Sequence, residues 1–322
     1  MLNDRPWHNP RMSDQNHFAI VGTGAVGGYY GALLQRAGYD VHFLLHRDYQ
    51  HVRRNGLSIE SCNGDFSLPV VNAYDNPAEM PRCATVIVAL KTTANQALPS
   101  ILPHLVKDDG MVLTLQNGLG SEREIAGIAG DEKVLGGLCF LCANKTAPGH
   151  IHHLDYGLIS LGEYRSTGEA GGITPRMEQL GIELKAAGIP IKLEKDLAQA
   201  RWKKLVWNIP FNGLSVVHNA LTDRLVGDPE IRKRCQTMMN EIAEAAKACA
   251  RPIDDGFIRK MMEDTEKMRP YAPSMKLDFD RGNPMELESI YGNPLRAAKA
   301  KGIEMPETEK LYHQLLAINP ST

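Results

Sequence analysis

A glycine-rich turn near the start of the chain constrains the fold more than any other feature of the sequence. The turn reads Gly22-Thr23-Gly24-Ala25-Val26-Gly27, and it joins an apolar run at 17–21 to a helical pattern at 25–37. In this position the first glycine permits a tight turn, the second lets the backbone approach a pyrophosphate, and the third lets the helix pack closely on the strand. Free N–H groups at the helix start attract phosphates. The turn therefore predicts a Rossmann-type domain that binds a dinucleotide; a glycine-rich turn without a ligand is the alternative.

The end of the second predicted strand decides between NAD and NADP. An NAD-binding chain usually carries an acidic residue there, about 20 residues after the glycines, which holds the ribose 2′-hydroxyl. This chain has Leu45-His46-Arg47 instead. A guanidinium pairs with a 2′-phosphate, whereas a carboxylate would repel it. We therefore expect NADPH/NADP as the cofactor, with Arg47 at the 2′-phosphate. Asp48 keeps NAD open, and Arg47 could also be an ordinary solvated cation.

Strand and helix patterns alternate through the first half of the chain. Such alternation predicts a parallel sheet covered by helices. Short strand-like pieces at 133–162 then predict an antiparallel extension of the sheet. The other strands are expected at 17–21, 40–45, 85–90, 111–115 and 189–193, with helices at 25–37 and 174–187.

Strand patterns end after residue 193, and only helical patterns follow. Glycine and proline separate these helices, which are expected at 196–219, 228–250, 256–267, 285–300 and 306–317. The predicted fold class is therefore α/β, with an N-terminal Rossmann-type parallel sheet, its antiparallel extension and an all-α C-terminal domain. We expect a disordered extension at 1–16, the NADP-binding domain at 17–195 and the helical domain at 196–322.

Composition and charge narrow the classes of partner. No apolar run approaches the roughly 20 residues that cross a bilayer, so we expect no membrane span. The 36 Lys and Arg against 38 Asp and Glu give a net charge of −2 without a basic block, so we expect no nucleic acid. Residues 1–16 lack the apolar core of a signal peptide, and Met12 could be the native start. A small-molecule substrate in the cytoplasm is expected; a homodimer is possible, but no pattern decides it.

The six cysteines are spread through apolar surroundings, which is typical of reduced intracellular thiols. Cys139 and Cys142 form a C-x-x-C pair in the apolar stretch 134–143. No second Cys or His pair stands at zinc spacing from them, so a buried strand is favoured over a metal or redox site. We expect no metal in the catalytic site.

One predicted helix carries a polar stripe. Lys204, Asn208 and Asn212 stand at i, i+4 and i+8, so their side chains drift by only about 80° around the helix. Apolar and aromatic residues surround them, and polar groups are costly to bury there without partners. The stripe therefore either lines a wet cleft or faces solvent. A second segment, Ser274-Met275-Lys276-Leu277-Asp278 with Gly282, Glu286 and Glu288, looks by itself like a loop entering a helix with acids in its first turn.

Taken together, these segments resemble the ketopantoate reductase family (2-dehydropantoate 2-reductases) from about residue 17 to residue 315. The matching motifs stand in the family's order. They are the turn at 22–27, Arg47, Lys91 at the end of V-I-V-A-L-K, the loop Gln116-Asn117-Gly118-Leu119-Gly120, the W-x-K-L-x-x-N-x-x-x-N-x-L pattern at 202–214, and Ser274-Met275-x-x-Asp278 with Gly282 and Glu286.

The resemblance implies NADPH-dependent reduction of the ketone of 2-dehydropantoate to (R)-pantoate, a step toward pantothenate and coenzyme A. Lys204 matches the family's general acid, because an ammonium can stabilise and protonate the oxyanion formed by hydride transfer. Glu286 matches the acid at the substrate's hydroxyl end. The remaining matches are substrate contacts from Asn208, Asn212 and Ser274, and Lys91 and Asn117 at the cofactor and substrate side of a cleft between the domains.

Three residues depart from the family pattern near the expected substrate end. Pro210 and Gly213 stand where common members carry an apolar residue and a proline, and Tyr291 stands where asparagine is frequent. The reaction type is therefore firmer than the substrate, and another small 2-oxo acid remains an alternative. Two further alternatives are a β-hydroxyacid-type dehydrogenase, against which the Ser274–Asp278 signature counts, and a non-catalytic NADPH sensor, which would need neither Lys204 nor Glu286.

Overall fold

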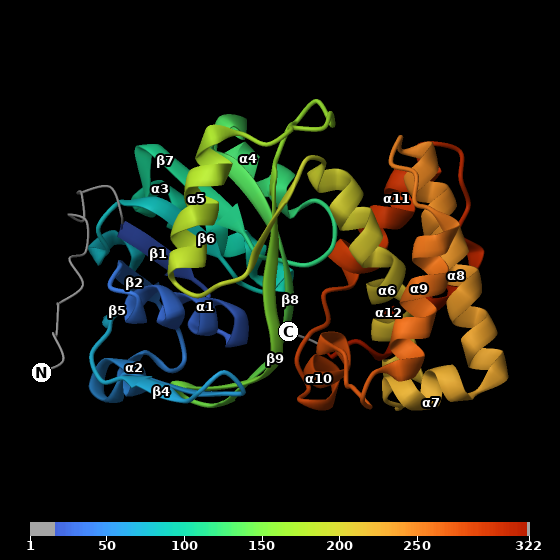
Figure 1. Ribbon diagram of the computed structural model, residues 1–322, viewed down its shortest axis with the longest axis horizontal. Helices are drawn as coiled ribbons and strands as arrows, with labels where there is room; N and C mark the ends of the chain where they lie inside the picture. The colour runs from blue at the N-terminus through green and yellow to red at the C-terminus, as the bar shows by residue number, and fades with distance from the viewer. Residues whose placement is uncertain (1–16, 321–322) are drawn as a thin grey trace, which may run out of the picture.

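The computed structural model describes residues 17–320, which form an α/β part and a helical part lying side by side (Figure 1). The α/β part contains one ten-stranded sheet. Its strands are β1 (His17–Val21), β2 (Asp40–Leu44), β3 (Leu57–Ser61), β4 (Phe66–Leu68), β5 (Asn72–Tyr74), β6 (Cys83–Val88), β7 (Val106–Thr114), β8 (Val134–Ala147), β9 (His150–Glu163) and β10 (Ile191–Glu194). The helices of this part are α1 (Ala25–Arg36), α2 (Tyr49–Asn55), α3 (Leu98–Leu105), α4 (Ser121–Ala129) and α5 (Pro175–Ala186), with short 3-10 turns at 77–79, 92–97 and 131–133.

The strand order is β4-β3-β9-β8-β7-β6-β1-β2-β5, with β10 paired to β9. The central strands from β8 to β5 run parallel, and β8 and β9 are antiparallel. Two apolar clusters cover the two faces of the sheet. The predicted fold class, a parallel sheet with an antiparallel extension followed by helices, is confirmed.

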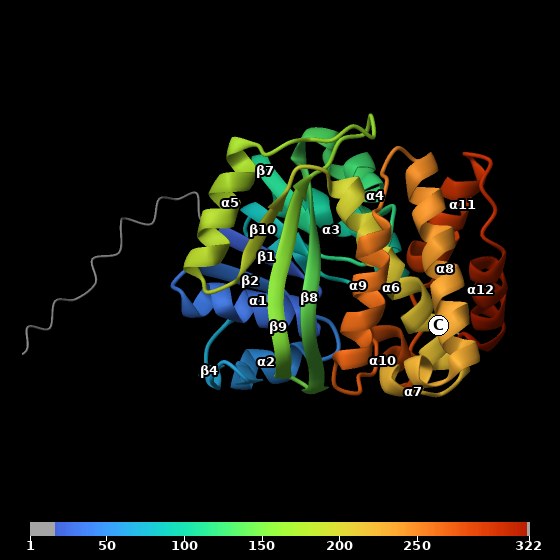
Figure 2. The ribbon, with the colours of Figure 1, turned by 45° about the vertical axis from the view of Figure 1, so that its right-hand side comes forward.

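The prediction of several short strands at 133–162 is wrong. This region forms two 14-residue strands, β8 and β9, which meet at Pro148 and Gly149. Gly157 does not end a strand: Phe140 pairs with Leu158 and Leu141 with Tyr156, so the glycine is bulged out of the ladder. A bulge keeps the strand continuous while changing its twist, and Figure 2 shows both strands running the height of the molecule beside the helical part.

The helical part has its own apolar core, made entirely of residues beyond position 200 apart from the partly buried Leu119. Its helices are α6 (Leu197–Val217), α7 (Thr222–Gly227), α8 (Pro229–Ala248), α9 (Asp255–Lys267), α10 (Ser274–Asp280), the π-helix η4 (Glu288–Gly292), α11 (Asn293–Lys299) and α12 (Pro306–Ile318). None of the helices in residues 17–320 has the length and hydrophobicity that a membrane crossing requires.

Several elements differ from the sequence prediction. The expected helix at 285–300 is divided into a π-helical turn and α11, and the segment expected as a loop at Ser274 is the short helix α10. Short elements such as β3, β4, β5, α2 and α7 were not predicted, because three to seven residues carry too little periodicity. The proposed extension at 1–16, with its alternative start at Met12, lies outside the described residues.

Candidate active site

Helix α6 carries Lys204 to the boundary between the two parts. The helix begins after Asp196, whose side chain accepts a hydrogen bond from the N–H of Gln199 and so caps the first turn. Lys204 Nζ donates to Asn117 Oδ1 at 2.8 Å and to the carbonyl oxygen of Cys139 at 2.7 Å. These acceptors belong to the loop after β7 and to β8, so three elements far apart in sequence fix the ammonium.

The pKa of Lys204 is lowered to about 8, mainly because the ammonium is buried. The neighbouring Arg201 guanidinium lowers the pKa further, whereas Cys139 and Glu286 act in the opposite direction. Both hydrogen-bond acceptors of the ammonium are neutral, so neither compensates fully for its lost hydration. An ammonium with this pKa can give up its proton close to neutral pH, as a general acid must.

A buried ion pair holds the loop on which Asn117 lies. Arg201 Nε donates to Glu122 Oε1 at 2.8 Å, and Arg201 Nη1 donates to the carbonyl oxygen of Gln116 at 2.6 Å. Arg201 is 3% exposed and Glu122 is also buried. A Cβ at Gly136 would lie 2.6 Å from Glu122 Oε1, so the glycine leaves room for the carboxylate. No local sequence pattern marks Arg201 or Glu122, because the two residues stand 79 positions apart in the chain.

The two asparagines of the predicted stripe, together with Ser274, line the same cavity as Lys204. Asn208 is 8% and Asn212 is 2% exposed, so the stripe does not face bulk solvent. Asn212 Oδ1 has no hydrogen-bond partner among residues 17–320. A buried acceptor without a partner is costly, and a bound hydroxyl or ammonium group would relieve that cost.

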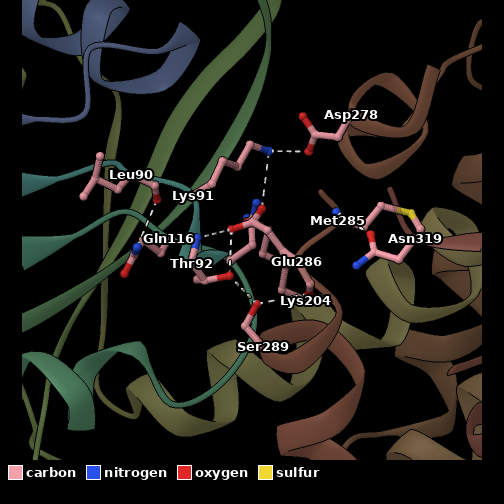
Figure 3. Close-up of polar contacts among 11 residues, drawn as sticks. Leu90, Lys91, Thr92, Gln116, Lys204, Asp278, Met285, Glu286, Ser289 and Asn319 are labelled. Carbon is pink, nitrogen blue, oxygen red and sulfur yellow. Dashed lines mark hydrogen bonds and ion pairs between the residues drawn. The ribbon is translucent and has the colours of Figure 1, made fainter. Parts of the chain in front are cut away.

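Lys91, which follows β6, joins the α/β part to two carboxylates of the helical part (Figure 3). Its Nζ lies 2.8 Å from Asp278 Oδ2 and 3.3 Å from Glu286 Oε2. The other oxygen of Glu286 accepts from the N–H of Thr92 at 2.8 Å and from its hydroxyl at 3.1 Å. Burial alone would lower the pKa of Lys91, but the two carboxylates outweigh it and raise the pKa.

Glu286 is placed differently from the other predicted site residues. It is 4% exposed and is not among the residues that line the cavity, and both of its oxygens have partners within the protein. Lys204 and Glu286 do lie in the same cluster, as Figure 3 shows, and the carboxylate raises the pKa of Lys204. They do not form a hydrogen bond with each other in the part of the chain that is described.

A cavity of about 1410 Å³ extends from Lys204 to the glycine turn. Residues Gly22 to Val26 line it, and a Cβ at Gly24 would meet nothing within 4 Å, so space for a ligand lies directly above the turn. The start of α1 has neither a side-chain cap nor an acidic residue, which leaves its N–H groups for an anion. Gly27 does not line the cavity; a Cβ there would lie 2.2 Å from the carbonyl oxygen of Gly22, so this glycine serves close packing of the helix. The cavity residues fit a dinucleotide.

Arg47 and Asp48 have different surroundings at the end of β2. Arg47 is exposed, lines the cavity, and forms no hydrogen bond or ion pair within residues 17–320. Asp48 pairs with Lys145 and accepts from the N–H of Gly149 at 3.3 Å, and only 11% of its side chain is exposed. Lys145 also donates to the carbonyl oxygen of Thr23 at 2.9 Å. The Asp48 carboxylate, which could have bound a ribose hydroxyl, is therefore paired with Lys145, whereas the Arg47 guanidinium has no partner within residues 17–320.

The C-x-x-C pair lies in β8 as predicted, but it is not fully buried. Cys139 and Cys142 are partly buried free thiols, and both line the cavity. Burial raises the pKa of both thiols, that of Cys139 to about 11. Both are therefore protonated at neutral pH, in which form they are poor nucleophiles and metal ligands.

Two of the departures from the family pattern are in direct contact. The Tyr291 ring is fully buried, and its hydroxyl donates to the carbonyl oxygen of Ile209 at 2.8 Å. A Cβ at Gly213 would lie 2.5 Å from that hydroxyl oxygen, so Gly213 makes room for the tyrosine. The helix α6 continues through Pro210 and Gly213. Gly213 and Tyr291 thus form one packed unit against α6.

Comparison with known proteins gives matches over almost the whole chain. The model of the family "Ketopantoate reductase PanE/ApbA" matches residues 18–166, and the model of its C-terminal domain matches residues 196–319. A 2-dehydropantoate 2-reductase of Nostoc sp. is 55% identical over 302 residues, which cover 94% of this chain and 95% of that protein.

Crystal structures of 2-dehydropantoate 2-reductases are similar as well. The one from Geobacter metallireducens has a TM-score of 0.90 at 43% identity, covering 94% of this chain and 99% of that one. The one from Methylococcus capsulatus has a TM-score of 0.85 at 32% identity, covering 95% and 98%.

Proposed function

Because this chain belongs to the ketopantoate reductase family, and so to the oxidoreductases, we propose that it reduces the ketone of 2-dehydropantoate to (R)-pantoate with NADPH. The observation that carries the proposal is the placement of Lys204, a lysine of lowered pKa, in one cavity with a glycine turn that fits a pyrophosphate. The six free thiols agree with a reducing compartment such as the cytoplasm.

Lys204 is the proposed proton donor. The bound cofactor supplies a hydride to C2 of the substrate, and negative charge then grows on the carbonyl oxygen. The Lys204 ammonium stabilises this charge and transfers its proton to the oxygen. Asn117 and the Cys139 carbonyl accept two of the three N–H groups of the ammonium, which leaves the third for the substrate.

The neighbouring polar side chains are proposed to orient the substrate. Asn208, Asn212 and Ser274 lie along the same cavity and would hold the carboxylate and hydroxyl of the substrate. The unpaired Oδ1 of Asn212 suits a hydroxyl donor. Glu286 does not line the cavity, and among residues 17–320 its Oε2 is held by Lys91 alone, at 3.3 Å, so contact with the hydroxyl end of the substrate would require Lys91 to turn away.

Lys91 and Arg47 are proposed to serve the cofactor. Lys91 lines the cavity between the glycine turn and Asp278, which is the cofactor and substrate side of the cleft. Arg47 pairs with the 2′-phosphate, because its guanidinium is free while Asp48 is engaged by Lys145. Arg47→Ala should therefore raise the KM for NADPH about ten- to hundredfold and change the KM for NADH little. Arg54→Ala, an exposed arginine in the neighbouring helix α2, is the control; equal losses with both cofactors would contradict the role of Arg47.

A panel of 2-oxo acids tests the substrate. NADPH oxidation is measured with 2-dehydropantoate, 2-oxoisovalerate and phenylglyoxylate at equal concentrations. We expect the highest kcat/KM with 2-dehydropantoate. A higher kcat/KM with another acid would identify that acid as the substrate. This outcome is worth testing because Gly213 and Tyr291 depart from the family pattern. Absence of turnover with every acid, despite NADPH binding, would instead indicate a sensor.

A further inference from the structure

A second cluster of ligand-type side chains lies outside the cavity, toward the amino-terminal ends of the parallel strands. His17 begins β1, and Asp40 and His42 stand at the start of the neighbouring strand β2. The glycine turn follows the opposite end of β1. None of the three residues lines the cavity described above, so the proposed reaction does not account for them.

The three ligand atoms converge. His17 Nδ1 lies 3.0 Å and His42 Nε2 lies 3.2 Å from the same carboxylate oxygen, Asp40 Oδ2. All three atoms lie within 4.8 Å of one another. Ligands about 2.0–2.2 Å from a tetrahedral zinc ion are separated from each other by about 3.3 Å. The two separations that involve Asp40 Oδ2 are close to this value, and the separation of the two imidazole nitrogens is at most 4.8 Å.

Outer residues orient two of the three ligands. Asn72 donates its amide N–H to Asp40 Oδ1 at 2.9 Å and leaves Oδ2 directed at the histidines. His42 Nδ1 lies 3.2 Å from the hydroxyl oxygen of Tyr74. Hydrogen bonds of this kind to the second ring nitrogen and to the second carboxylate oxygen accompany most metal-bound histidines and carboxylates, because they fix the ring orientation and tautomer.

His42 also has an unsatisfied buried nitrogen. The residue is 6% exposed, and its Nε2 lies 3.2 Å from Asp40 Oδ2 but forms no hydrogen bond with any of residues 17–320. A buried ring nitrogen without a hydrogen-bond partner is costly, and a bound metal ion would give it a partner.

We propose that His17 Nδ1, Asp40 Oδ2 and His42 Nε2 bind a divalent transition metal ion such as Zn²⁺. Two imidazoles and one carboxylate are ligands that zinc and its first-row neighbours accept, whereas Mg²⁺ and Ca²⁺ prefer oxygen alone. About a third of the His17 and Asp40 side chains is exposed, which provides a path for the ion and leaves room for a water ligand. The ion would join β1 to β2 at their starts and stabilise that edge of the sheet.

Zinc titration of the full-length protein, purified without a histidine tag and stripped of metal, tests the proposal. Isothermal calorimetry should show one Zn²⁺ ion per chain at this site. His17→Ala and Asp40→Asn should each weaken that binding by at least about tenfold. The control is His152→Ala, which removes another partly exposed histidine beside a carboxylate, 3.6 Å from Glu60, and should leave the affinity unchanged.

Two further measurements make the result decisive. Zn²⁺ should raise the melting temperature of the parent protein and of His152→Ala but not that of His17→Ala, a variant that keeps the buried His42 intact. The absorption spectrum with Co²⁺ should lack the thiolate-to-metal band that the free cysteines would produce. Equal zinc affinity in His17→Ala and the parent protein, a thiolate band, or no binding at pH 7.5 would overturn the proposal. The proposed reduction of a 2-oxo acid stands or falls separately, because these variants lie outside the cavity.

Discussion

Two lysines reach the same cavity and are made chemically different by their partners. Lys204 is buried, donates within residues 17–320 only to neutral oxygens, those of Asn117 and Cys139, and has a guanidinium nearby; its pKa falls to about 8. Lys91 faces two carboxylates, and its pKa rises even though burial alone would lower it. Only Lys204 can therefore exchange a proton near neutral pH, while Lys91 remains a fixed positive charge.

The difference follows from which parts of the fold each lysine joins. Lys204 belongs to the helical part and points into the edge of the sheet, where backbone and amide oxygens meet it. Lys91 belongs to the α/β part and points toward the helical part, where Asp278 and Glu286 meet it. A cation that carries out proton transfer must lack a strong counter-ion, whereas a cation that holds two domains together needs one.

The largest expected effect is that of Lys204→Ala. If Lys204 is the proton donor as proposed, its loss should lower kcat by roughly 10² to 10⁴ while the affinity for NADPH barely changes. Lys203→Ala, which removes the adjacent lysine on α6, is the matched control and should retain most activity. Steady-state kinetics and a binding titration of NADPH check both variants; unchanged turnover in Lys204→Ala would remove it from the mechanism.

Lys91→Ala should have a smaller effect of another kind. The carboxylates of Asp278 and Glu286 would lose their counter-ion beside an anionic substrate, so we expect kcat/KM to fall about tenfold, chiefly through a higher KM. Its pH profile should keep the parent shape. A loss of kcat as large as that of Lys204→Ala would contradict the division of roles between the two lysines.

The smallest expected effect concerns the pH dependence of kcat/KM in the parent protein. Reduction needs Lys204 protonated, so kcat/KM should be constant below about pH 8 and fall as pH rises above it. Oxidation of the alcohol needs the neutral amine and should show the opposite trend. If kcat/KM for the reduction does not fall near pH 8, the result would disagree with the pKa of Lys204.

Variants of Arg201 test whether its charge sets the pH at which kcat/KM falls. The double variant Arg201→Gln with Glu122→Gln removes the guanidinium charge without leaving a buried ion unpaired, and it should raise the pKa of Lys204, so that kcat/KM begins to fall at a higher pH. Arg201→Lys retains the charge and should leave that pH unchanged. If both variants behave alike, the guanidinium acts only through the Gln116 loop and not through its charge.

The sequence was most informative where a residue type is needed locally. The glycine turn, the free Arg47 and the stripe of Lys204, Asn208 and Asn212 all lie where spacing places them, because helical and strand periodicity depends only on neighbours in the chain. The same local rule failed at 133–162, where bulges absorb Gly157 and keep two long strands continuous. It also failed at Glu288–Gly292, where a π-helical turn interrupts the pattern.

By itself, the sequence determined the type of sheet and placed the glycine turn and the Lys204 stripe on their elements. Only the tertiary structure decided that Glu286 is held by Thr92 and Lys91, that Arg201 pairs with Glu122, and that Asp48 is neutralised by Lys145. These contacts join residues from 79 to 195 positions apart in the chain. The pKa of a buried group depends on its desolvation and on the charges around it, and both are set by packing rather than by the order of residues.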